Sequence, residues 1–168
     1  MLSRFAAAVV MCGLLLGGCG FQPLYGERAG GEQVRQAFGG IAVVPIDDRV
    51  GQLVHNQLID SLTPRGVPQA PVYELTVTLE QTKEGVAFQR DEQATRFNVA
   101  LEATFVLREI ATGAVVTSGQ TRSVAAFNIV RSEFANITAE ADALRRAARQ
   151  VADSIALRLG VHFNATDT

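Results

Sequence analysis

The chain carries few side chains of the types that catalyse reactions or bind metals. It has two histidines, His55 and His162, and neither has a histidine, cysteine or carboxylate nearby at metal-ligand spacing. The adjacent acids at 47–48 and 91–92 are explained by a helix N-cap and a solvated loop. No nucleophile elbow, P-loop or dinucleotide fingerprint occurs. We therefore expect no catalytic residue, no metal, no cofactor and no enzymatic activity.

Basic side chains in the middle of the chain are the candidates for ligand binding. Arginine pairs with phosphate through two parallel hydrogen bonds, and lysine binds it as a point charge. Four such residues fall in loops and strand ends, namely Lys83, Arg90, Arg96 and Arg122. Gathered at one end of a sheet they could hold a phosphorylated lipid head group. Taken one at a time, each is more simply explained as a scattered surface charge.

The first 18 residues have the organisation of a secretory signal peptide. Arg4 and the free amine precede an apolar run over residues 5–16, which is too short to cross a bilayer as a helix of about 20 residues. The segment Leu16-Gly17-Gly18-Cys19 resembles a bacterial lipobox. This resemblance implies that Cys19 is diacylated on sulfur, cleaved from Gly18 and acylated on its new amine. The alternative is a soluble secreted protein whose cysteine lies near the cleavage site by chance.

An acylated Cys19 would be a permanent membrane anchor, because each buried methylene contributes about 0.8 kcal/mol and several chains act together. In lipoproteins an aspartate after the cysteine marks retention in the inner membrane. This chain has Gly20 at that position, so the resemblance implies the outer membrane. Residues 19–36 are then expected to form an acylated tether, since glycine keeps a chain flexible and proline keeps it extended.

The mature chain would be one domain's length. Removal of residues 1–18 leaves 150 residues and shifts the formal net charge from −2 to −3. Cys12 leaves with the signal peptide, so Cys19 has no partner for a disulfide. The acidic balance, the absence of tryptophan and the presence of only two tyrosines argue against nucleic-acid binding.

Apolar periodicity predicts a single α+β domain over residues 37–163. Alternation with period two predicts strands with one wet face, and spacing of i, i+3 and i+4 predicts two amphipathic helices. The expected architecture is a two-layer sandwich of two helices packed on a four-stranded sheet, in the order β-α-β-β-β-α. The expected strands cover residues 41–46, 72–81, about 97–107 and about 114–127, and the helices about 49–62 and about 137–159.

Individual residues predict where these elements end. The acids at 47–48 offer an N-cap for the first helix, and Asn136 offers one for the last, with Gly160 as its stop. Residues 111–113 are typical of a hairpin turn, and Gly119 predicts a β-bulge. The stretch 82–94 is expected to be a polar segment, and residues 164–168 a disordered tail.

The last helix is expected to carry a solvated, charge-compensated face. Its i, i+4 pairs are Asp142 with Arg146 and Arg149 with Asp153, and Arg145 lies beside them.

Two segments resemble the LptE family of lipopolysaccharide-assembly lipoproteins, in its alphaproteobacterial type. They are Cys19-Gly20-Phe21-Gln22-Pro23-Leu24-Tyr25-Gly26, and Ala126-Phe127-Asn128-Ile129 with Ser132 and Phe134-Ala135 before an Ala/Arg-rich helix. The resemblance covers essentially the whole mature chain and implies two helices on a four-stranded sheet. It also implies a periplasm-facing outer-membrane lipoprotein that plugs the β-barrel LptD, helps it assemble and assists insertion of lipopolysaccharide into the outer leaflet. Lipid A phosphates are the implied ligand, whereas the four basic residues named above rest on position and charge.

Two other functions stay open at this point. An accessory lipoprotein of another envelope transport system would share the anchor and the domain, and would bind a periplasmic or inner-membrane protein. A lipid-anchored periplasmic hydrolase would need His55 or acidic residues gathered around a pocket.

Overall fold

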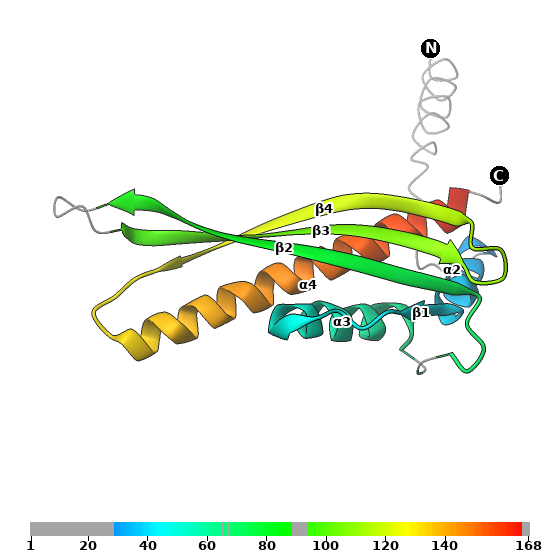
Figure 1. The fold of residues 1–168 in the computed structure, drawn as a ribbon, viewed down its shortest axis with the longest axis horizontal. Helices are drawn as coiled ribbons and strands as arrows, with labels where there is room; N and C mark the ends of the chain where they lie inside the picture. Colours follow the sequence, from blue (N-terminus) through cyan, green and yellow to red (C-terminus); the bar gives the residue numbers. More distant parts are fainter. Residues whose placement is uncertain (1–28, 65, 67, 89–93, 166–168) are drawn as a thin grey trace, which may run out of the picture.

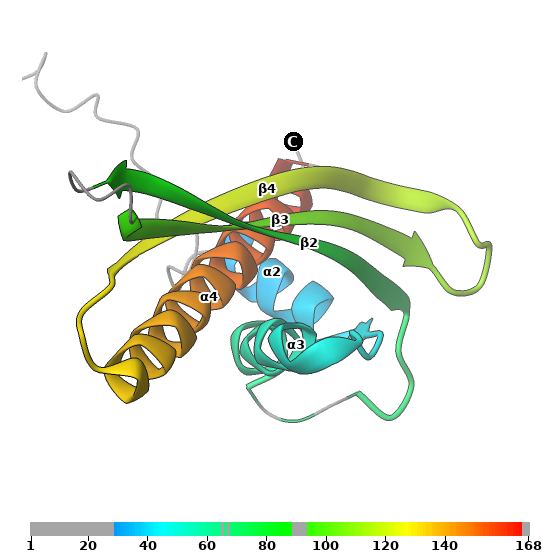
Figure 2. The ribbon, with the colours of Figure 1, turned by 60° about the vertical axis from the view of Figure 1, so that its left-hand side comes forward.

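A computed structural model describes residues 29–64, 66, 68–88 and 94–165, and in it three helices cover one face of a four-stranded sheet (Figures 1 and 2). The predicted signal peptide, Cys19 and Arg90 lie outside the described residues. The elements in chain order are α2 (Ala29–Gly39), β1 (Ile41–Val43), α3 (Asp48–Leu62), β2 (Tyr73–Phe88), β3 (Ala94–Glu109), β4 (Val115–Asn128) and α4 (Glu133–Ala165).

The strands lie in the sheet in the order in which they occur in the chain. The order is β1-β2-β3-β4, with β1 parallel to β2 and the other neighbours antiparallel. The strands β2 and β3 form a long hairpin, whereas β1 pairs only with Tyr73–Leu75. The predicted α+β class and the predicted order of its elements are confirmed, with one further helix before β1.

The core lies between the helices and the inner face of the sheet. Alternate residues of β3, such as Leu101 and Phe105, are fully buried there. Helix α4 faces them with a buried stripe made mainly of alanine, which includes Ala147 and Ala152. Small side chains let the helix axis come close to the sheet. Most of the largest fully buried side chains come from the strands and α3, and Ile155 and Leu159 come from α4.

Helix α2 was not expected, and the predicted tether boundary at residue 36 falls inside it. Glycines at its start give the segment the composition of a linker. Val34 and Phe38, four residues apart, are nevertheless buried, and the Phe38 ring packs edge-on against Phe163 of α4 with centroids 6.4 Å apart. Tertiary burial therefore outweighs the weak helix propensity of the glycines.

The β2–β3 hairpin extends further than its apolar pattern, so the prediction of a polar segment over 82–94 is wrong for most of its length. Strand β2 continues to Phe88, and β3 begins at Ala94. Beyond residue 81 the hairpin projects past α3, where the side chains of β2 are largely exposed (Figure 1). Backbone pairing continues without a buried face, and a burial pattern cannot show it.

Helix α4 is longer at both ends than predicted. Asn136 does not cap it; its amide instead bonds the backbone N–H and carbonyl of Val130, at 2.8 and 2.9 Å, and the hydroxyl of Ser132 accepts from the Ala135 N–H. Gly160 does not end it either, because this glycine is buried within the helix. Residues 164–165, expected in the tail, still belong to α4, and the rest of the tail lies outside the described residues.

The turns give a mixed result. The hairpin turn at 111–113 is confirmed, and Gly113 adopts the positive φ of 72° that the turn requires. The bulge predicted at Gly119 is wrong, because this residue pairs in regular register with Phe105, and the irregularity lies between Leu107 and Arg108. Gly119 is needed for space instead, since a Cβ there would lie 3.0 Å from the Phe105 ring.

The connection from β1 to α3 is tightly built. Asp47 occupies the predicted N-cap position without a side-chain capping bond, and Asp48 takes a φ of 69°, a conformation that non-glycine residues rarely adopt. Ile46 packs onto α3 where Gly51 leaves room. A Cβ on Gly51 would lie 2.7 Å from the Ile46 side chain and 2.9 Å from its carbonyl oxygen.

This packing makes Gly51→Ala destabilising, although alanine is ordinarily the better helix former. We expect the free energy of unfolding to fall by about 1–3 kcal/mol, as for other overpacked sites, measured by urea denaturation. Gly39→Ala is the matched control, because a Cβ there meets nothing within 4 Å, and its stability should change by less than about 0.5 kcal/mol. A Gly51→Ala protein as stable as the control would contradict the packing.

Candidate functional site

Lys83 is held by the fold at the end of the molecule where the hairpin projects. Its Nζ donates to the Glu140 carboxylate of α4 at 2.6 Å and lies 5.3 and 5.4 Å from the ring centroids of Phe97 and Phe127. These two rings stack on each other with centroids 5.8 Å apart. The charge of Lys83 is therefore already paired, and its position ties β2 to α4 across the ends of β3 and β4.

The other basic residues predicted to bind a ligand are not brought together with Lys83. Arg96 and Arg122 alternate with buried residues, so both lie on the outer face of the sheet, while Lys83 is on the helix side. Arg96 is paired with Asn128, which is six residues from Arg122 along β4, or about 20 Å at 3.3 Å per residue. Arg90 lies outside the described residues.

An exposed apolar surface, which we call the apolar tip, covers the connection from β4 to α4 and the start of α4. Phe134 is 80 % exposed and Ile137 62 %. The apolar tip consists of Ile129, Val130, Phe134 and Ile137. Its first residue, Ile129, follows Asn128, which is the partner of Arg96 on β4, and Arg131 lies in the same segment. Exposed apolar patches of this kind mark interaction sites for proteins or lipids.

The sequence contains a signal for the apolar tip that is separate from the basic residues. Four large apolar residues occur in nine positions, from 129 to 137, before and at the start of α4, whose buried stripe begins only at Ala143. These apolar residues follow the strand predicted over about 114–127 and come no later than the first position of the helix predicted over about 137–159. No buried face is therefore predicted for them, and they are candidates for an exposed binding surface.

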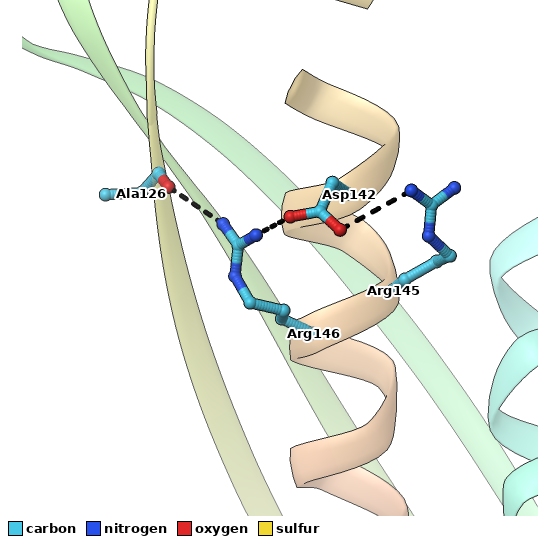
Figure 3. Close-up of polar contacts among 4 residues, drawn as sticks. All are labelled: Ala126, Asp142, Arg145 and Arg146. Carbon is cyan, nitrogen blue, oxygen red and sulfur yellow. Dashed lines mark hydrogen bonds and ion pairs between the residues drawn. The ribbon is translucent and has the colours of Figure 1, made fainter. Parts of the chain in front are cut away.

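The charged face of α4 is confirmed in part. Asp142 forms an ion pair with Arg146 and lies 3.4 Å from Arg145 (Figure 3). Arg146 also donates to the backbone carbonyl of Ala126 at 3.1 Å, so it covers an acceptor on the free edge of β4. The predicted Arg149–Asp153 pair is wrong, because Asp153 instead accepts from Gln57 of α3.

The described residues hold no group of three or more histidine, cysteine or acidic side chains placed to bind a metal. His55 lies half-buried on α3, and His162 lies within α4 rather than after it. Within the same part of the chain, no helix has the length and apolar character needed to cross a membrane.

The fold and these surfaces define a two-layer α+β domain suited to binding. A family model described as LptE, lipopolysaccharide-assembly, matches residues 38–159. The chain belongs to the LptE family. Curated proteins yield no sequence match.

Solved structures of three bacterial proteins share the fold. A protein from Caulobacter crescentus CB15 assigned as a lipoprotein superposes with a TM-score of 0.65 at 24 % identity, over 77 % of this chain and 95 % of that one. Rare lipoprotein B from Shewanella oneidensis gives 0.59 at 10 % identity, over 77 % and 98 %. A minor lipoprotein from Acinetobacter baumannii gives 0.59 at 15 % identity, over 73 % and 92 %.

The Lys83–Glu140 pair should make a small, salt-sensitive contribution to stability, because both side chains are about one third exposed. A double-mutant cycle with Lys83→Met and Glu140→Gln should give a coupling below about 1 kcal/mol. It should shrink in 1 M salt, where the Debye length is about 3 Å. Methionine keeps an apolar stem against the two rings, so the cycle isolates the charge. A coupling below about 0.2 kcal/mol at low salt, or one that salt does not reduce, would contradict the prediction.

Proposed function

We propose that this chain is an outer-membrane lipoprotein, anchored through Cys19, that works with the β-barrel LptD to place lipopolysaccharide in the outer leaflet. Membership of a lipopolysaccharide-assembly family supports the assembly role. The lipobox-like segment ending at Cys19 and the lipoproteins among the similar structures support the anchor. Assembly is a matter of binding and positioning, which supports the expectation that the protein is not an enzyme.

The outer face of the sheet supports the part of the proposal that concerns the barrel. Barrels with wide lumens have polar interiors, so a plug needs a rigid surface rich in polar side chains. The three long strands present such a surface on the side that none of the described helices α2, α3 and α4 covers (Figure 2). Its exposed residues include Thr76, Thr78, Glu80, Glu102, Thr104, Ser118, Gln120 and Arg122.

The observation that carries the glycolipid part of the proposal is the apolar tip beside Arg96. Lipopolysaccharide presents phosphates next to acyl chains, and this end of the domain presents guanidinium groups next to exposed apolar side chains. Phe134 and Ile137 would contact the acyl chains, and Arg96 would pair with a phosphate. Of the predicted ligand-binding residues that the structure describes, Arg96 is thus the best placed, because Lys83 is paired with Glu140 and Arg122 lies farther along the sheet. Arg90 stays a prediction.

The barrel proposal is tested by a detergent pull-down of the C-terminally tagged full chain from its native envelope, with partners identified by mass spectrometry. We expect one large outer-membrane β-barrel in near-equal amount. Recovery of periplasmic or inner-membrane proteins without a barrel would contradict the proposal and favour an accessory role in another transport system.

The glycolipid proposal is tested by binding of purified protein to lipopolysaccharide. Arg96→Ala and Phe134→Ser should each weaken binding by about tenfold, the equivalent of about 1.4 kcal/mol. Leu157→Ser is the matched control, because Leu157 is an exposed apolar residue of α4 far from the apolar tip, and this variant should bind normally. Equal loss in Leu157→Ser, or unchanged binding in Phe134→Ser, would show that the apolar tip is not the site.

A further inference from the structure

Strand β2 is much longer than β1, the strand that pairs with its outer edge. β1 pairs only with Tyr73–Leu75, and the Val44 N–H makes the last bond, to the Leu75 carbonyl at 2.9 Å. The next N–H that could face β2 belongs to Ile46, which packs against Gly51 of α3 and makes no backbone bond to β2. From Val77 onward, no strand of the described chain lies along this edge of β2.

The backbone groups that point out of this edge can be identified. Because the Leu75 carbonyl faces β1, the odd-numbered residues of β2 direct both N–H and C=O away from β3. Val77, Leu79 and Gln81 therefore offer three donors and three acceptors. None of these groups has a hydrogen-bond partner among the described residues.

A groove of about 350 Å³ lies beside these groups. Val77, Leu79 and the buried Leu101 contribute apolar surface from the sheet. Ile46 contributes it from the β1–α3 connection, and Val50 contributes it from α3. The contact between Ile46 and Gly51 fixes the α3 side of the groove, so this side is rigid before anything binds.

The charge on the groove has one sign. Among the described residues that line it, Asp47 and Asp48 alone are ionisable, and both are exposed. A basic side chain on an occupant would find these carboxylates at the end of the groove near α3.

The two long edges of the sheet differ in how they are protected. On β4, Arg146 donates to the Ala126 carbonyl, so a charged side chain from α4 occupies the edge (Figure 3). Such charges oppose the addition of another strand. Between Val77 and Gln81, β2 has no equivalent contact in the described part of the chain and is bordered by the groove instead.

We infer that this groove docks an extended segment of a partner polypeptide, which adds a strand to β2 beyond the end of β1. The segment bonds the backbone of Val77, Leu79 and Gln81 and places apolar side chains, at alternate positions, in the groove. A lysine or arginine of the segment lies near Asp47 and Asp48. The inference does not depend on the partner being a barrel.

The first test places a photo-crosslinking amino acid at Thr78 in the full chain in its native envelope. Thr78 lines the groove and is exposed, and an added strand would bring a side chain within about 5 Å of it. The matched control position is Thr104, the partner of Thr78 on the central strand β3. We expect Thr78 to cross-link to a partner segment with alternating apolar residues and a basic residue. Thr104 lies on the outer face proposed to meet a barrel, so any cross-link from it should be to a different segment.

The second test removes one donor from the edge. Gln81→Pro deletes an N–H that points out of the sheet and leaves the hydrogen bonds to β3 in place, whereas Gln81→Ala keeps that N–H. Gln81→Pro should lower the yield of the Thr78 cross-link by about tenfold, and Gln81→Ala should not. Matching thermal midpoints and circular dichroism spectra of the two variants would establish that both fold.

Several outcomes would overturn the inference. They are the absence of a cross-linked polypeptide at Thr78, cross-linking of one segment from both Thr78 and Thr104, capture of this chain's own residues or of a second copy, and equal yields in Gln81→Pro and Gln81→Ala. Barrel recovery in the pull-down is read separately, so either proposal can fail while the other stands.

Discussion

The close approach of α4 to the sheet is the constraint on which the rest of the structure depends. A helix of 33 residues can lie close against β3 and β4 only where much of its inner side is small. Alanine and glycine make up six of the nine buried residues from Ala143 to Gly160, and the other three are Val151, Ile155 and Leu159. Both α2 and α3 then pack against α4, and the core side chains of β3 fill the space between the layers. Larger residues at the alanine positions would lift the helix from the sheet and disturb the packing of α2 and α3 against it.

Apolar periodicity was sufficient to predict the layers of the fold, because a helix or strand with one buried face repeats apolar residues with its own structural period. Strands β3 and β4 and helix α3 have one face in the core, so their patterns predicted them closely. The pattern failed where structure forms without a continuous buried face, as in the outer half of the β2–β3 hairpin. It also failed for α2. Of the α2 side chains that the structure describes, those of Val34 and Phe38 are buried. Two such positions within a glycine-containing segment do not make a recognisable stripe.

The binding surfaces were less predictable, because the fold determines which charged side chains are paired within the domain and which stay available to a ligand. Lys83 and Arg96 look equivalent in the sequence, yet alternation places them on opposite faces, and only Lys83 meets a carboxylate from α4. The open edge of β2 arises from the difference between the lengths of two strands. Pro45 marks the end of the shorter one, but the reach of the longer one becomes visible only in the pairing register.

The length of α4 sets a distance between the two ends of the domain. Its 33 residues span about 50 Å at 1.5 Å per residue. Helix α2 packs at its C-terminal end, through Phe38 and Phe163, and the apolar tip lies at the opposite end (Figure 1). The hydrocarbon core of a bilayer is only about 30 Å thick. A domain tethered to one leaflet ahead of α2, and oriented along the membrane normal, therefore has the reach to present the apolar tip at the level of the other leaflet without any additional spacer.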